Sequence, residues 1–552
     1  MVSLKPFSSY NSRNSNNHEK NNSTDSNKNS DNEKPSLFFA MALSLMAAFG
    51  GFIYGYDTGS ISGIINLPPF LRNFGRMHDD GSYYFPVYRS GLIVSIVSVG
   101  GLFGSLISSR LADSLGRIKT IFGFNILYMV GLIIQITATK SWVQIMMGRL
   151  FGGMAIGAFS VAVPMLISEC VPSNLRDACV SCWQFMITLS ILIGNAVCYG
   201  VRHTQGNGGY QLPIGLGFIY SSLLFLAILI LPESPRYLAS LGKVEEAHKA
   251  LARTVRMKPH SKYIDIEMHD ILESIEKDKA LGTASWSELF TGKPKMFYRV
   301  MVGIFTLSLQ QLCGANYFFY YGTTIFTALG SRDSFATSMI LSGVNCGCTL
   351  FGMYVVNRIG RRILLFWGAA LMLVSFLIFA SLGSFALYTD NNDPNGPADA
   401  PIGRAMIFFA CLYIFGFATT WAPLAFVVVS EIFPQRIRPK GMALGTSSLW
   451  LWNFCISFFT PMITADIGYK YGYVFSGCVL FSLFFVYFCI HETQGMTLED
   501  IDTMYGTGVK PWKSPKYVKE IRAMRKRELQ EGISSKGIPP AVSSSEGVAP
   551  EA

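Results

Sequence analysis

The sequence predicts an all-α membrane protein with twelve transmembrane helices, arranged as two bundles of six joined by a charged linker. Three observations support this fold class. Half of the 552 residues are hydrophobic and only 14% are charged, against roughly 25% charged residues in an average soluble protein. Apolar runs long enough to cross about 30 Å of hydrocarbon recur along the chain. Charged loop motifs of the first half return in the second half.

Six apolar runs precede a long charged segment, and six follow it. Each run can form one membrane-spanning helix because a helix rises about 1.5 Å per residue. The predicted spans lie near residues 37–65, 88–109, 119–139, 142–168, 178–200, 212–231, 299–328, 335–356, 363–388, 404–430, 442–463 and 472–490.

The composition divides the chain into five parts. Residues 1–35 are rich in Asn, Ser and Lys and predict a disordered tail. The spans form an N-terminal bundle (36–231) and a C-terminal bundle (298–490). Between them, residues 232–297 alternate charged and apolar positions, which is typical of amphipathic helices at a membrane surface. Residues 491–552 are polar and basic and predict a second disordered tail.

Lysine and arginine gather in the loops that follow even-numbered spans, whereas the loops after odd-numbered spans mostly carry single cations. Because positive charge favours the cytoplasmic side of a membrane, we expect the linker and both tails to be cytoplasmic. The first outer loop is an exception, since it holds Arg72, Arg76 and Arg89.

The two halves of the chain repeat a charged loop. Span 4 ends in ECVPSNLR and span 10 ends in EIFPQRIR. A glutamate, a proline three residues later and an arginine seven residues later therefore recur at an offset of 262 residues. DSLGR after span 2 corresponds in the same way to NRIGRR after span 8. This order indicates two homologous bundles with a site between them near the membrane midplane.

The repeated charges lie where the two bundles meet the cytoplasm. We interpret them as an inner gate, in which ion pairs between the bundles hold the inner side closed while the outer side is open. Solvated charges under a positive-inside bias are the alternative. The predicted gate consists of Arg117, Glu169, Arg176, Arg361, Glu431 and Arg438.

Two charged residues lie inside apolar spans, where an ionised side chain costs at least about 2.5 kcal/mol. Asp57 is about eight residues, or ~12 Å, from the outer end of span 1. Arg149 is about seven residues, or ~10 Å, from the outer end of span 4. Because the two charges share a depth, we expect them to pair and to offset each other's desolvation.

Amide side chains also recur near the midplane. Gln310 and Gln311 lie ~17 Å from the inner end of span 7, and Asn345 lies ~15 Å from the outer end of span 8. Trp450 lies ~13 Å up span 11, and Gln184 lies in the lower half of span 5. Hydroxyl-rich ligands need such donors and acceptors beside an apolar wall. Hydrogen bonds that only hold helices together are the alternative for each amide alone.

Other classes of function find no support in the sequence. The eleven cysteines lie in apolar spans or at the end of one, and no metal-type cluster stands out, so we expect no disulfide framework and no metal site. No P-loop or nucleophile elbow appears, so neither a primary pump nor a hydrolytic enzyme is indicated. We expect no cofactor and no nucleic-acid partner.

Motifs throughout residues 40–505 resemble the sugar porter family of the major facilitator superfamily. They are GYDTG (55–59), GR (116–117), GRLFGG (148–153), the loop 169–176, PESPRYL (232–238), QQLCGANYFFYYGT (310–323), GRR (360–362), SEIFPQRIR (430–438) and HETQGMTLED (491–500). The stretch ATTWAPLAFVVVSE (418–431) is similar to the fungal hexose transporter branch. The resemblance implies the twelve-helix fold of that superfamily.

The resemblance also implies roles for individual residues. Asp57 and Arg149 match the proton-coupling pair of symporters, while Tyr320 and Tyr321 match an outer gate. The positions that match sugar contacts are Gln184, Gln310, Gln311, Asn316, Asn345, Phe426, Leu449 and Trp450.

Three positions depart from the family pattern. Leu449 stands where an Asn or Gln is usual, which removes an amide contact to the sugar. Phe426 stands where Trp or Tyr is common and lacks the polar tip. Asn357 stands where an acidic residue usually precedes the arginine after span 8, so the gate charges of the second half have one ion pair fewer. The first two departures make fructose a candidate substrate beside glucose.

The resemblance therefore implies a monomeric hexose importer of a fungal plasma membrane, with both termini cytoplasmic. We expect alternating access with proton symport through Asp57 and Arg149. A passive hexose facilitator is the nearest alternative. A sugar sensor without net transport is a third, although sensors have longer tails than the one after residue 491.

Overall fold

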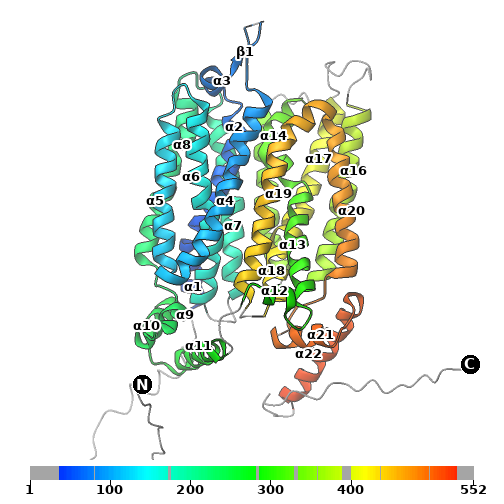
Figure 1. Cartoon of the computed structure of the whole chain (residues 1–552). Helices are drawn as coiled ribbons and strands as arrows, with labels where there is room; N and C mark the ends of the chain where they lie inside the picture. The colour runs from blue at the N-terminus through cyan, green and yellow to red at the C-terminus, as the bar shows by residue number, and fades with distance from the viewer. Residues whose placement is uncertain are drawn as a thin grey trace, which may run out of the picture.

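The computed structural model describes residues 36–79, 81–171, 176–280, 285–328, 334–356, 358–387, 400–434, 437–496 and 498–530. The predicted N-terminal tail, 1–35, lies outside these residues, as does Asn357. The described chain is almost entirely helical, and Figure 1 shows two bundles of long helices side by side with shorter helices beneath them.

The first bundle contains seven long helical segments. They are α1 (Leu37–Ala47), α2 (Phe49–Ile64), α4 (Val87–Leu115), α5 (Arg117–Ile136), α6 (Trp142–Cys170), α7 (Arg176–Val201) and α8 (Gly208–Ile230). The predicted first span is a bent pair, because α1 and α2 meet at 46°. Helix α3 (Pro68–Phe74) and a short hairpin of β1 (Arg76–Met77) and β2 (Tyr83–Tyr84) lie between α2 and α4. We call the end of the molecule that carries this hairpin the hairpin end.

The linker forms four short helices at the opposite end, which we call the linker end (Figure 1). They are α9 (Pro235–Ser240), α10 (Val244–Val255), α11 (Lys262–Ala280) and α12 (Glu288–Thr291). Helices α9, α10 and α11 share a small apolar core around Leu251, Val255 and Ile264. The backbone N–H of Ser36 donates to the carbonyl of Val255 (3.2 Å), so α10 contacts the start of α1.

The second bundle repeats the first. Its elements are α13 (Met296–Leu312), α14 (Ala315–Ala328), α15 (Ser334–Val356), α16 (Arg361–Phe385), α17 (Ala400–Gly416), the π-helical turn η1 (Phe417–Trp421), α18 (Ala422–Ile432), α19 (Arg438–Ile467), the 3₁₀ turn η2 (Gly468–Lys470) and α20 (Tyr471–Cys489). The predicted seventh span is interrupted between α13 and α14. Gly314 has a φ of +95° there, a conformation that glycine adopts without steric cost.

These elements give the twelve predicted crossings. Within the described residues, nine helical segments are long and apolar enough to span a membrane, and the bent α1–α2 pair makes a tenth. One of the nine runs from Arg438 to Cys489 and contains both α19 and α20, which Figure 1 shows as separate rods. The broken pair α13–α14 supplies the last crossing. The prediction of an all-α membrane fold with two six-helix bundles is confirmed.

The bundles meet mainly along three helix pairs: α2 with α14, α4 with α19, and α7 with α15. Helix α7 also contacts α18. Neutral hydrogen bonds join them toward the hairpin end. Ser62 Oγ lies 3.1 Å from Thr323 Oγ1, and Asn195 Nδ2 donates to Ser342 Oγ (3.0 Å). The bundles are therefore in contact in the half of the interface nearer the hairpin.

The prediction of a disordered tail after residue 491 is wrong for residues 498–530. They form α21 (Leu498–Gly506), η3 (Pro511–Lys513) and α22 (Ser514–Gln530). The physical reason is a buried anchor: Arg299, at the start of α13, is fully buried and its Nη1 lies 2.6 Å from Asp502 Oδ1. The Arg299 guanidinium also lies over the ring of Tyr505, at 4.2 Å from its centroid.

His491 lies just beyond α20 in this docked segment. Its side chain is buried, and its Nε2 lies 2.9 Å from the carbonyl of Val509. Burial, together with the nearby cations Lys295, Arg362 and Arg299, lowers the pKa of His491 from 6.5 to about 4.

The first prediction concerns pH. Because the pKa of His491 is lower in the folded protein than in the unfolded chain, the unfolded chain binds this proton more readily. The neutral, buried His491 therefore contributes at most about 3 kcal/mol to the free energy of unfolding. This contribution is complete above pH 6.5 and is lost as the pH falls toward 4. In His491→Gln, an amide can still donate to Val509 but does not titrate. We expect its melting temperature to fall less than that of the wild type between about pH 7 and about pH 5. An equal fall of the melting temperature in the variant and in the wild type would contradict this assignment.

Candidate functional site

Asp57 of α2 and Arg149 of α6 form a bidentate ion pair, as their common depth predicts. Arg149 Nη1 donates to Asp57 Oδ1 and Arg149 Nη2 donates to Asp57 Oδ2, each at 3.1 Å. The side chains are 14% and 3% exposed, respectively. The planar guanidinium fits a carboxylate edge on, which makes this the strongest geometry available to such a pair.

A third contact of Arg149 ties the ion pair to α4. Arg149 Nε donates to the carbonyl of Ile93 at 2.8 Å. All three nitrogens of the guanidinium are therefore used, two by α2 and one by α4. Loss of the carboxylate charge would weaken both contacts of Arg149 with α2 and leave its contact with α4 intact.

The predicted amides Gln310, Gln311 and Asn316 lie together at the break between α13 and α14. Gln311 Nε2 donates to Gln310 Oε1 (3.2 Å), and Asn316 Nδ2 donates to Gln311 Oε1. Gln310 Nε2 donates in turn to the carbonyl of Ala422 (3.2 Å), at the start of α18. The break brings Asn316, five residues after Gln311, back to the same place.

Asn453 of α19, which was not among the predicted site residues, completes this network. Its Nδ2 donates to Gln311 Oε1 (3.4 Å), and its Oδ1 accepts from Tyr320 Oη (3.2 Å) and from Ser98 Oγ (2.7 Å). The available signal was helical spacing, because Asn453 lies one turn after Trp450 and therefore shares its face. Ser98 belongs to α4, so this contact joins the network to the first bundle.

Two further predicted residues are buried with an unused polar atom. Trp450 is 2% exposed, its ring centroid lies 5.8 Å from that of Tyr54, and its Nε1 has no hydrogen-bond partner among the described residues. Asn345 on α15 is also 2% exposed, and its Oδ1 has no partner in the same part of the chain. Buried polar groups are normally paired, so a donor and an acceptor at this depth are open to a hydroxylated ligand.

The remaining predicted residues are more scattered. Leu449 is buried beside Trp450, and Gln184 is half-buried on α7. Phe426 on α18 is 36% exposed. Tyr321 Oη donates to the carbonyl of Ser457, which joins α14 to α19 within the second bundle.

Four of the predicted inner-gate residues form ion pairs inside their own bundle. Arg117 Nε and Nη2 donate to the two carboxylate oxygens of Glu169, both at 2.9 Å, and Arg361 Nη2 donates to Glu431 Oε1 at 3.1 Å. These pairs form because the start of one helix and the end of another lie side by side within each bundle. The predicted latch between the bundles belongs to a conformation that is open at the outer side, and it stays a prediction. Arg438 begins α19 and is half-buried, whereas the side chain of Arg176 lies outside the described residues.

A second glutamate completes each cluster in the same way. Glu233 accepts from the backbone N–H of Arg117 (3.0 Å), and Glu492 accepts from that of Arg361 (2.9 Å). A carboxylate at a helix N-terminus satisfies free N–H groups and complements the helix dipole. Gly116 and Gly360 precede these arginines, and a Cβ on either would lie within 2.6 Å of the glutamate oxygen. The PESPR and HETQG motifs thus serve equivalent positions in the two halves.

The fold and these paired clusters define a membrane transporter with two pseudo-symmetric bundles. Residues 43–505 match the family model described as "Sugar (and other) transporter", and the chain belongs to this family. The family consists of transporters, which confirms that the chain is not an enzyme.

Several known proteins are similar to this chain. The low-affinity glucose transporter HXT1 of Saccharomyces cerevisiae is 46% identical over 474 residues, covering 86% of this chain and 83% of the relative. The high-affinity hexose transporter HXT6 of the same yeast is 45% identical over 480 residues, covering 87% and 84%. The structure of the proton:xylose symporter XylE bound to 6-bromo-6-deoxy-D-glucose has a TM-score of 0.69 at 22% identity, covering 85% of this chain and 99% of that one. This structural similarity supports the fold of two six-helix bundles.

The second prediction tests Asn453. Asn453→Ala removes four side-chain hydrogen bonds, three of them to other helices. It should raise the KM for hexose uptake about tenfold or more, with a smaller change in the amount of protein at the cell surface. Leu451→Ala is the matched control, since Leu451 lies on the same helix and is 54% exposed. Equal KM values for Asn453→Ala and the wild type would contradict a role in the site.

Proposed function

We propose that this protein imports hexoses across the plasma membrane by alternating access. The observation that carries the proposal is the amide network of Gln310, Gln311, Asn316 and Asn453, which lies against the first bundle through Ser98. Amides donate and accept at once, which suits the hydroxyls of a sugar. The named glucose and hexose transporters among the relatives support the same substrate class.

Access to the site alternates through the interface between the bundles. The described contacts on the hairpin side are neutral hydrogen bonds, each contributing about 1 kcal/mol. Such contacts can be exchanged between conformations at low cost. The Arg–Glu clusters at the linker end keep each bundle intact while the bundles rock against each other.

The transported sugar is coupled to a proton through Asp57. Protonation removes the charge that holds Arg149 Nη1 and Nη2, and Arg149 then remains bound to the carbonyl of Ile93. Because α4 carries both Ile93 and Ser98, a change at the ion pair reaches the amide network along one helix. The bidentate geometry and low exposure of the pair support this assignment.

A passive facilitator is the second candidate function, since a permanent Asp57–Arg149 pair could be purely structural. The names of the yeast relatives state glucose or hexose transport and no coupling ion. A non-transporting sensor is a third and is tested by restoring hexose uptake in cells that lack hexose transporters.

The same proposal includes the setting of the protein. The functional unit is a monomer in the plasma membrane, and both termini are cytoplasmic. Large apolar side chains that are exposed in the bundles, such as Phe103, Leu229 and Trp367, contact lipid.

The third prediction concerns coupling. In Asp57→Asn, the carboxylate that exchanges the proton is absent, so we expect uphill sugar accumulation and sugar-induced alkalinisation of the medium to be lost. Equilibrative exchange of labelled hexose should persist. Asp466→Asn is the control, because Asp466 is an exposed carboxylate near the hairpin end. The facilitator alternative holds instead if the wild type shows no alkalinisation and Asp57→Asn transports normally.

The fourth prediction concerns the choice of sugar. Leu449 is 4% exposed beside Trp450, and Leu449→Asn places an amide there. We expect the ratio of glucose to fructose uptake to change by about threefold or more, since one hydrogen bond contributes about 1 kcal/mol. Leu449→Ala shows what the loss of volume does alone. An unchanged ratio in Leu449→Asn would show that this position does not select the substrate.

A further inference from the structure

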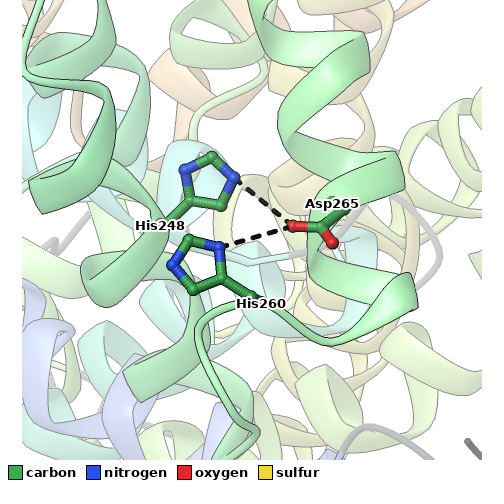
Figure 2. Close-up of side chains that lie close together, drawn as sticks. All are labelled: His248, His260 and Asp265. Atoms are coloured by element: carbon green, nitrogen blue, oxygen red, sulfur yellow. Dashed lines mark ion pairs between the residues drawn. The ribbon is translucent and has the colours of Figure 1, made fainter.

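Two histidines and an aspartate converge on one point of the linker, far from the transport site. His248 belongs to α10, His260 to the loop after it, and Asp265 to α11 (Figure 2). His248 Nε2 lies 3.5 Å and His260 Nδ1 lies 3.9 Å from the same oxygen, Asp265 Oδ1. Figure 2 shows both rings turned toward this carboxylate.

The outer nitrogen of each ring already has a hydrogen-bond acceptor in reach. His248 Nδ1 lies 3.0 Å from the carbonyl of Val244, one turn earlier on α10. A carbonyl only accepts, so Nδ1 carries the hydrogen and the neutral ring presents the lone pair of Nε2 toward Asp265. His260 Nε2 lies 3.4 Å from Glu245 Oε1, and this is the closer of its two carboxylate contacts. The tautomer with the hydrogen on Nε2 presents the lone pair of Nδ1 to Asp265.

With the hydrogens on His248 Nδ1 and His260 Nε2, three acceptors face one another without a donor between them. A cation at their centre removes this repulsion. Histidine ligands of metals typically donate their other N–H to a carbonyl or a carboxylate, which fixes the ring orientation. His248 with Val244 and His260 with Glu245 have this second set of contacts.

The spacing of the three atoms fits a small metal ion. Bonds of about 2.0–2.2 Å in tetrahedral geometry place neighbouring ligand atoms about 3.4 Å apart. The two separations from Asp265 Oδ1 are 3.5 and 3.9 Å, and the three ligand atoms lie within 4.8 Å of one another. Two imidazoles and one carboxylate suit Zn²⁺ and leave a fourth position for water.

We propose that His248, His260 and Asp265 bind a divalent transition metal of the Zn²⁺ type. The metal closes the loop of residues 256–261 and fastens α10 to the first turn of α11. Since Val255, at the end of α10, accepts from Ser36 at the start of α1, the fastened unit abuts the first membrane helix. The sequence does not reveal this cluster, because the three residues are spaced over 248–265 and gather only when α10 and α11 fold together.

The fifth prediction tests this site directly. The full-length protein, purified with a tag that contains no histidine and stripped with a chelator, is placed in nanodiscs and titrated with ZnCl₂ by calorimetry. His248→Ala, His260→Ala and Asp265→Asn should each weaken Zn²⁺ binding about tenfold or more. Zn²⁺ should also raise the melting temperature of the wild type, and this rise should be absent in the three variants.

His269→Ala is the matched control. His269 is an exposed histidine on α11 that lies beside Asp270 and Glu273 in a separate exposed group. Its substitution should leave the affinity unchanged. Binding that survives in all three site variants, or that is lost in His269→Ala instead, would overturn the proposal. Equal melting temperatures of variants and wild type without Zn²⁺ show that a lost affinity is not a failure to fold.

Discussion

The ion pair between Asp57 and Arg149 is the interaction on which the first bundle depends. Each charge alone would be costly at membrane depth, and breaking a buried pair by removing one partner costs about 3–5 kcal/mol. The desolvation cost of the pair is offset because Arg149 uses all three guanidinium nitrogens, two on Asp57 and one on Ile93. This requirement fixes α2, α4 and α6 relative to one another around a single side chain.

Strong and weak interactions are distributed differently over the molecule. The bidentate pair of Arg117 with Glu169 and the pair of Arg361 with Glu431 both act within a bundle, and Glu233 and Glu492 reinforce them. The described side-chain hydrogen bonds between bundles are neutral, such as those of Ser62 with Thr323 and Asn195 with Ser342. Charged contacts are worth roughly twice neutral ones. Each bundle is thus stiffer than the interface, which is the condition for rigid-body motion.

Much of this arrangement follows from properties that act along a single helix. Span positions follow from apolar length, and the pairing of Asp57 with Arg149 follows from equal depth. Contacts that depend on which helix faces which do not follow. Asn453 was missed because its importance comes from Ser98 and Gln311 on other helices, and the docked α21 was missed because its anchor, Arg299, lies about two hundred residues earlier. The ion pairs of the gate charges within each bundle were not predicted, for the same reason.

Helix α4 connects the energetics of the site to its chemistry. The carbonyl of Ile93 accepts a hydrogen bond from Arg149 Nε. Five residues later, the hydroxyl of Ser98 donates to Asn453 Oδ1, which also accepts from Tyr320 Oη. These two positions are about 7.5 Å apart along the helix axis. A helix that packs against both α6 and α19 cannot shift at one position without shifting at the other. Release of Arg149 from Asp57 and rearrangement of the amides around a sugar are therefore two effects of one rigid element, and neither requires the bundles to unfold locally.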